Sequence, residues 1–113
     1  MVYRNERVVF RFLALTKDMV ANLREFQEGV DSRSSYNHPG YVTGTFLLQE
    51  GESYEWIESF IAKHGIREEE YDIFVSLSTD SDSEIVDVPA FAMALSRKVG
   101  GGMTFSFTVL SES

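Results

Sequence analysis

The stretch VVFRFLAL, residues 8–15, decides the fold of this chain. Its odd and even positions are both apolar, apart from Arg11. A strand that is apolar on both faces is typical of the middle of a sheet covered on both sides. We therefore expect a central strand here, with Arg11 near an end or reaching out of the sheet.

Apolar runs and helical patterns alternate along the rest of the chain. Thr16 can cap the first helix, Gly65 with Ile66 is typical of a Schellman helix end, and residues 38–41 (His-Pro-Gly-Tyr) suit a type II turn. The spacing predicts strands near 8–15, 41–49, 71–79 and 103–110, and helices near 17–28, 53–64 and 89–99.

These elements predict an α+β fold with a single mixed β-sheet and helices mainly on one face. If residues 84–88 return as a short edge strand beside 71–79, residues 41–110 form a ferredoxin-like βαββαβ core preceded by an extra βα unit. A length of 113 residues is that of a single domain, residues 1–113.

The composition excludes several classes of function. Hydrophobic residues make up 43% of the chain, enough for a core, and the formal net charge is -8. This charge argues against direct binding of nucleic acid or of an anionic membrane, since both need basic surfaces. The sequence shows neither a signal peptide nor the roughly twenty apolar residues of a membrane span, so we expect a cytoplasmic protein.

Motifs for catalysis, metals and cofactors are incomplete. His38 and His64 are far apart in the sequence, and the chain has no cysteine. Residues 80–84 (DSDSE) resemble the start of a calcium loop, but Ile85 and Phe91 occupy the positions that require glycine and glutamate. The glycines at 100–102 follow a helix, whereas phosphate loops precede one. We expect a protein that is not an enzyme and that holds no metal or cofactor.

The negative charge is concentrated in one part of the sequence. Residues 50–87 contain twelve of the 18 acidic residues and only two of the ten basic ones, Lys63 and Arg67. Such a field attracts a basic partner, although it can also serve solubility alone. The expected partner-binding residues are Glu55, Glu58, Glu68, Glu69, Glu70, Asp72, Asp80 and Asp82, with Trp56 and Tyr54 as aromatic anchors.

The chain resembles the small acidic immunity proteins of bacterial toxin systems, including contact-dependent growth inhibition. The resemblance is carried by size, acidity, lack of cysteine and α+β layout, and locally by VPAFAMAL (residues 88–95), Gly100 and the Phe-rich strand that follows. Phage-encoded inhibitors of bacterial defence, including anti-CRISPR proteins that imitate nucleic acid, share this profile. The resemblance implies an inhibitor of a basic toxin nuclease or nucleic-acid-binding effector.

A second class of function stays open beside this one. A ferredoxin-like domain can bind a small ligand, or act as a regulatory oligomer, through its sheet face or a subunit interface. The polar positions Thr104, Ser106 and Thr108 of the last strand are compatible with water or with a second subunit, and the sequence leaves the oligomeric state open. An enzyme that uses carboxylates alone is a third alternative.

Overall fold

The computed structural model describes residues 4–80 and 88–109. In chain order, the elements are β1 (Arg4–Leu15), α1 (Lys17–Phe26), β2 (Asp31–Ser34), β3 (Val42–Leu47), α2 (Glu55–His64), the short 3₁₀ helix η1 (Glu68–Glu70), β4 (Tyr71–Thr79), α3 (Ala90–Val99) and β5 (Gly102–Val109). In the described part of the chain, no helix combines the length and the apolar character needed to cross a lipid bilayer.

The strands in the described part of the chain form one five-stranded mixed sheet in the order β2-β3-β1-β4-β5. β1 is central, as expected, and is antiparallel to both β3 and β4. β2 is antiparallel to β3, whereas β5 is parallel to β4. The expected α+β fold with a single mixed sheet is therefore confirmed.

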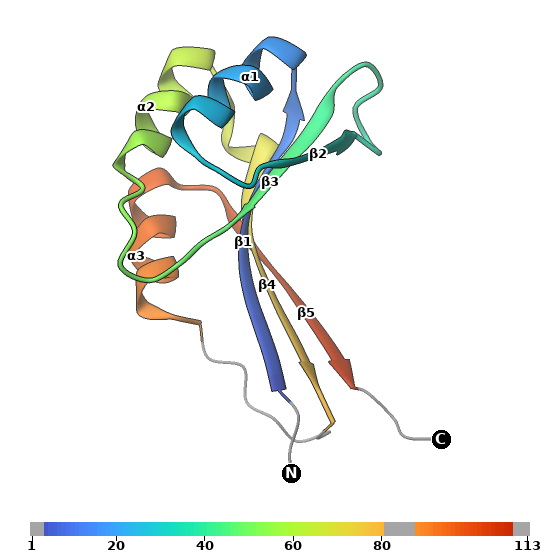
Figure 1. Ribbon diagram of the computed structural model, residues 1–113, viewed down its shortest axis with the longest axis vertical. Coiled ribbons are helices and arrows are strands. Elements are labelled where there is room, and N and C mark those ends of the chain that lie inside the picture. Colours follow the sequence, from blue (N-terminus) through green and yellow to red (C-terminus); the bar gives the residue numbers. More distant parts are fainter. Residues whose placement is uncertain (1–3, 81–87, 110–113) are drawn as a thin grey trace.

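All three helices lie on one side of the sheet (Figure 1). Phe10 and Phe12 of β1 point to this side and are fully buried, and the ring of Phe12 packs against that of Phe60 from α2 at 5.2 Å between centroids. Val9 and Leu13 point to the opposite side, where they are only half-buried. The expectation that β1 is covered on both faces was wrong, because none of the helices in residues 4–80 and 88–109 covers the face of the sheet that carries Val9 and Leu13.

The ferredoxin-like core is present, but it lies earlier in the chain than predicted. The elements β1 to β4 have the βαββαβ order and the strand arrangement of that motif, so α3 and β5 form an extra unit after the core. The sequence pattern predicted this extra unit in front of the core. β4 is occupied by β1 on one edge and β5 on the other, which leaves no edge for a return strand; most of the predicted strand 84–88 lies outside the described residues.

The predicted local signals are confirmed at three connections. Thr16 Oγ1 accepts a hydrogen bond from the backbone N–H of Met19 at 3.2 Å, which caps α1. Gly65 ends α2 with a φ of 61°, and the N–H of Ile66 bonds the carbonyl of Ile61 at 3.1 Å. The N–H of Tyr41 bonds the carbonyl of His38 at 3.1 Å, closing the turn between β2 and β3.

Gly44 of β3 gives a test of how tightly this core is packed. A Cβ at this position would lie 2.9 Å from Leu15 Cδ1 and 3.3 Å from Leu23 Cδ2. We expect Gly44→Val to lower the free energy of unfolding by about 1–3 kcal/mol, the usual cost of overpacking. Urea denaturation measures this loss. The matched control is Gly102→Val in β5, where a Cβ meets nothing within 4 Å, and equal losses in both variants would contradict the prediction.

Candidate functional site

The acidic residues expected to form one recognition surface lie in separate places. Those with exposed side chains are Glu55, Glu58, Glu68, Glu69 and Asp80. The first two are on α2, the next two are on η1, and the last follows β4. The nine residues of β4 separate η1 from Asp80, a distance of roughly 30 Å at the rise of a strand. These acidic residues are therefore spread along the molecule and do not form one compact cluster, and Asp82 lies outside the described residues.

Asp72 does not belong to an exposed acidic surface. It is 9% exposed and lies on the uncovered face of the sheet, where its Oδ1 accepts a hydrogen bond from Arg11 Nε at 2.7 Å. Its Oδ2 accepts from Arg11 Nη2 and, at 2.7 Å, from Thr104 Oγ1. The pair explains why Arg11 is tolerated in the central strand, and it corrects the expectation that Asp72 faces a partner.

Glu70 has a structural role as well. Its Oε1 accepts hydrogen bonds from the backbone N–H of Arg67 at 3.0 Å and from Arg67 Nε at 3.3 Å, which caps η1. The backbone hydrogen bond from Arg67 is the main cause that lowers the pKa of Glu70 below its ordinary value of 4.5; burial opposes it, and the guanidinium of Arg67 lowers the pKa further. Its carboxylate is thus already hydrogen-bonded within the chain.

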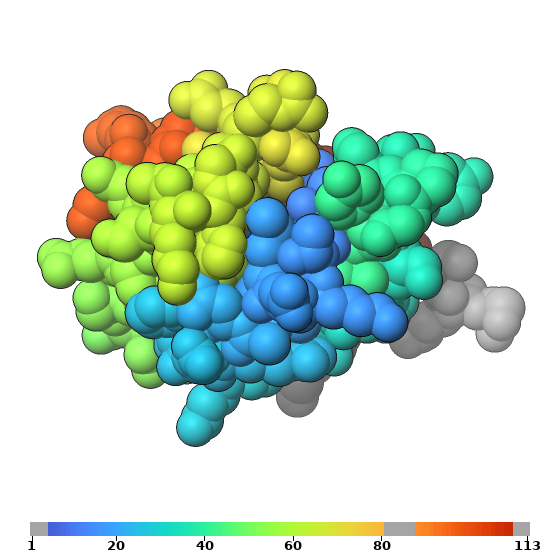
Figure 2. All heavy atoms as spheres, turned by 90° about the horizontal axis from the view of Figure 1, so that it is seen from above, coloured from blue at the N-terminus to red at the C-terminus, as the bar shows by residue number. Residues whose placement is uncertain are grey.

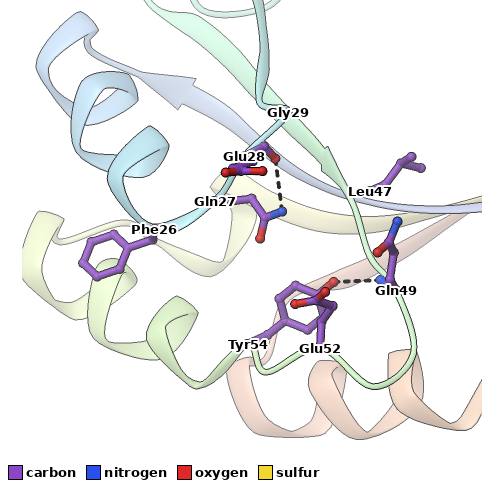
Figure 3. A pocket seen from close by; sticks show the side chains of 8 residues that line it. All are labelled: Phe26, Gln27, Glu28, Gly29, Leu47, Gln49, Glu52 and Tyr54. Carbon is purple, nitrogen blue, oxygen red and sulfur yellow. Dashed lines mark hydrogen bonds between the residues drawn. The ribbon is translucent and has the colours of Figure 1, made fainter.

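A cavity of about 540 Å³, here called the acidic pocket, lies between the end of α1 and the loop before α2 (Figure 3). Its lining consists of Phe26, Gln27, Glu28, Gly29, Leu47, Gln49, Glu52 and Tyr54. Two of these residues are acidic, two are aromatic and none is basic. Phe26 is apolar yet 49% exposed, so the rim of the pocket offers apolar surface. Leu47 is 42% exposed, but it is in register with Val9, and Figure 3 shows its side chain pointing away from the pocket.

Tyr54 is held in place at one side of the acidic pocket. Its hydroxyl oxygen accepts a hydrogen bond from the N–H of Gln49 at 2.7 Å. Burial raises the pKa of Tyr54, and the carboxylate of Glu52 adds to this, although the bond from Gln49 opposes it. The phenol therefore stays protonated at neutral pH, and its O–H can donate to a ligand.

Trp56 packs against the ring of Phe26, which lines the acidic pocket. It is half-buried, and its ring stacks on that of Phe26 at 5.4 Å with an interplanar angle of 7°. It also packs against Phe46 at 5.6 Å. The exposed aromatic ring at this site is therefore that of Phe26, and Trp56 fixes its orientation.

A second hollow of about 310 Å³ adjoins the acidic pocket between the start of α2 and α3. Glu52 and Tyr54 line both hollows, and Glu55 and Phe91 line the second one. Of the predicted partner-binding residues, the structure thus brings Tyr54 and Glu55 together at one concave surface. The others lie outside these two hollows, apart from Asp82, whose placement is not described.

The two histidines, distant in sequence, line the same cavity of about 270 Å³. This cavity is lined by the end of β1 with the start of α1, by the turn between β2 and β3, and by the end of α2 with η1. These three segments meet at the end of the molecule seen in Figure 2. His64 Nε2 lies 2.8 Å from Asn22 Oδ1, and His38 Nδ1 lies 3.4 Å from Ser35 Oγ. Ser35 Oγ donates its proton to the Leu13 carbonyl at 2.9 Å, so His38 is not placed to activate it as a nucleophile. Within residues 4–80 and 88–109, no three acidic or histidine side chains are arranged to hold a metal ion.

The uncovered face of the sheet carries a groove of about 360 Å³ with a different character. Arg7, Arg11 and Arg33 line it together with Asp31, several hydroxyl side chains and the ring of Phe74. The guanidinium of Arg11 lies 4.5 Å from the centroid of the Phe74 ring. This groove is the most basic hollow described above, and it is on the opposite side of the sheet from the helices.

Of the eight residues that line the acidic pocket, the sequence predicted only Tyr54 as a binding residue. Phe26 has the helical spacing of a core residue, but it is the last residue of α1 and lies at the rim. Glu28 falls outside the acidic stretch 50–87, and Leu47 was assigned only to a strand. The one indication in the sequence was a phenylalanine near the expected end of a helix, two residues before a glutamate.

No protein-family model matches the chain, and comparisons with curated proteins and with solved structures also return no match.

Removal of the Asp72 charge tests its structural role. We expect Asp72→Asn to lower the free energy of unfolding by about 2 kcal/mol, because it leaves a partly buried guanidinium without its counter-charge. Thermal or urea denaturation measures the change. Asp80→Asn, at an exposed position, is the control and should stay within about 0.5 kcal/mol of the parent. A loss no larger than that of the control would contradict this account of Asp72.

The lowered pKa of Glu70 predicts a pH dependence of stability. A carboxyl with a lowered pKa in the folded state stabilises the fold above its unfolded pKa, and this contribution disappears as the pH falls through the folded pKa. Glu70→Gln should therefore be less stable than the parent at pH 7, with the difference shrinking below pH 4.5. Denaturation at several pH values measures it, with Glu69→Gln as the control. A difference that does not depend on pH would refute the prediction.

Proposed function

We propose that the protein is an acidic inhibitor that binds a basic protein partner and that the acidic pocket receives an arginine or lysine side chain of this partner. One observation carries the proposal: a single concave site combines the carboxylates of Glu28 and Glu52 with exposed apolar and aromatic surface. Acidity spread over a surface would serve solubility equally well, whereas this combination suits a cationic side chain with an apolar stem.

The pocket offers each part of such a side chain a matching group. Carboxylates form charge-assisted hydrogen bonds with a guanidinium or ammonium group. The ring of Phe26 lies at the rim of the pocket, where its stacking on Trp56 holds it in place and it offers apolar surface to the stem of the side chain. The protonated hydroxyl of Tyr54 and the amides of Gln27 and Gln49 supply neutral polar contacts at the same site.

The net charge of -8 should raise the rate of association with a basic partner and orient the two proteins as they approach. A basic surface that holds phosphate is attracted to an acidic protein over a Debye length of about 10 Å at 0.1 M salt. Occupation of that surface prevents nucleic acid from binding there. The proposed partner is accordingly a toxin nuclease or a nucleic-acid-binding effector, and the protein acts without catalysis as an immunity protein or as a phage anti-defence inhibitor.

The sheet groove favours a second candidate function, a domain that binds a small anionic ligand. Arg7 and Arg33 suit a negative group of a ligand in this groove, whereas Arg11 is already paired with Asp72 and covers the ring of Phe74. Mass spectrometry of the denatured protein, purified from its host, would detect such a ligand. A stoichiometric anion lost in Arg7→Ala/Arg33→Ala, without a protein partner, would favour this candidate over the first.

Charge-matched variants test the acidic pocket directly. We expect Glu28→Gln/Glu52→Gln to weaken partner binding at least ~10-fold, mainly through faster dissociation, since a desolvated cation loses its counter-charges. The control pair Glu58→Gln/Glu69→Gln removes two exposed acids elsewhere and should slow association only a few-fold. The partner is first captured from nuclease-treated host lysate, so that nucleic acid cannot bridge the proteins, and its kinetics are then measured with purified components.

Binding kinetics at several salt concentrations distinguish long-range electrostatic attraction from direct contact in the acidic pocket. Added salt should slow association of the parent and of both variants, while the difference in dissociation rate between the pocket variant and the parent persists. If the pocket pair binds no more weakly than the control pair, the cationic side chain is not held in this pocket. If purified partner binds the parent with no dependence on salt, the basic-partner hypothesis itself is wrong.

A further inference from the structure

The two edges of the sheet differ sharply in how they are protected against pairing with another strand. β2 forms one edge with only four residues, and two of these, Asp31 and Arg33, are charged. β5 forms the other edge with eight residues, GMTFSFTV, which include neither a charge nor a proline. Exposed edge strands of monomeric proteins are usually short, charged or interrupted, and β5 has none of these features.

β5 also exposes apolar side chains on the side of the sheet that the helices cover elsewhere. Phe105 and Phe107 are in register with the buried Val75 and Leu77 of β4, so they point to the helical side. They are nevertheless 55% and 44% exposed, and Val109 is 44% exposed. Figure 1 shows that β5 continues beyond the lower end of α3.

The sequence of β5 is a chemical palindrome centred on Ser106. Phe105 and Phe107 flank the centre, Thr104 and Thr108 follow on either side, and the apolar Met103 and Val109 complete the pattern. A two-fold axis requires a surface that complements itself. If two β5 strands meet antiparallel with Ser106 on the axis, each Phe105 faces Phe107 of the other copy, and each Thr104 faces Thr108. Aromatic pairs and threonine pairs are both favourable across strands.

We infer that the occupant of this edge is a second copy of the chain and that two copies join through β5 into a continuous ten-stranded sheet. The axis is normal to the sheet, so the helices of both copies lie on the same side and the exposed phenylalanine rings form one apolar strip. Because β2 is protected by its charges, pairing stops at two copies. The lack of charge on β5 also makes this edge a place where two molecules of net charge -8 can approach without direct contact between acids.

The size of the exposed surface sets the strength of this dimer. The exposed fractions of Phe105 and Phe107 correspond to roughly 200 Å² per copy, taking about 200 Å² for one phenylalanine. Stable interfaces bury about 800 Å² on each partner, of which the rings supply only part. We therefore expect a reversible dimer that dissociates on dilution.

Single cysteines provide the sharpest test, because the chain has none of its own. In the proposed register, Ser106→Cys places two thiols opposite each other and should form a disulfide-linked dimer under mild oxidation. Thr104→Cys alone and Thr108→Cys alone should not, since equivalent residues would lie about 13 Å apart along the strands. A mixture of these two variants should form the disulfide between unlike copies. Ser32→Cys on β2 is the control and should remain unlinked.

Sedimentation velocity over a range of concentrations provides the second measurement. Ser106→Lys places like charges on the axis and should raise the dimer dissociation constant at least ~10-fold, while Thr45→Lys, on the uncovered face away from β5, should leave it unchanged. Circular dichroism checks that both variants are folded. A parent that stays monomeric up to about 1 mM, a dimer disrupted by Thr45→Lys instead, or cross-linking of Ser32→Cys as fast as of Ser106→Cys would each overturn the inference.

Discussion

The alternation of side chains along β1 is the constraint on which the rest of the structure depends. Phe10 and Phe12 point to the helical side and are fully buried, and their rings contact those of Phe46, Phe60 and Tyr71 from three other elements. A shift of one residue would exchange them for Arg11 and place a charge in the core. The same alternation puts Arg11 on the uncovered face, beside Asp72, where the charge has a partner. The core and the ion pair thus fix one register together.

The sequence predicted those elements whose patterns are local. The apolar runs and the helical spacings located four strands and three helices, and the residues at Thr16, Gly65 and Gly40 marked connections that the structure confirms. β2 could not be found in this way, because DSRS is polar and exposed at every position and has no periodicity to detect. Once β2 was missed, the hairpin of the ferredoxin-like core was placed one unit too late in the chain.

The candidate site was predictable only in part, because it depends on contacts between distant segments. The acidic stretch 50–87 contains Glu52, Tyr54 and Glu55, but the pocket is completed by Phe26, the last residue of α1, and by Glu28 in the loop that follows. The pattern of charge along a sequence does not show which carboxylates are already hydrogen-bonded within the chain. Asp72 and Glu70 are two such carboxylates, bonded to Arg11 and Arg67. Nor does this pattern show that His38 and His64 share a cavity, since the turn between β2 and β3 brings them together.

The acidic pocket and the uncharged edge strand β5 lie in different parts of the fold, so a basic partner and a second copy of the chain could be bound at the same time. The acidic pocket lies beside the end of β3, and β5 is three strands away across the sheet, about 14 Å at the usual strand spacing. Pairing through β5 therefore leaves the pocket of each copy open, on the outer sides of the dimer. Two pockets on one rigid sheet would engage two basic side chains or two partner molecules, and linked binding of this kind gains avidity without any new contact. An uncharged edge and an acidic pocket on opposite sides of one small sheet are thus compatible features.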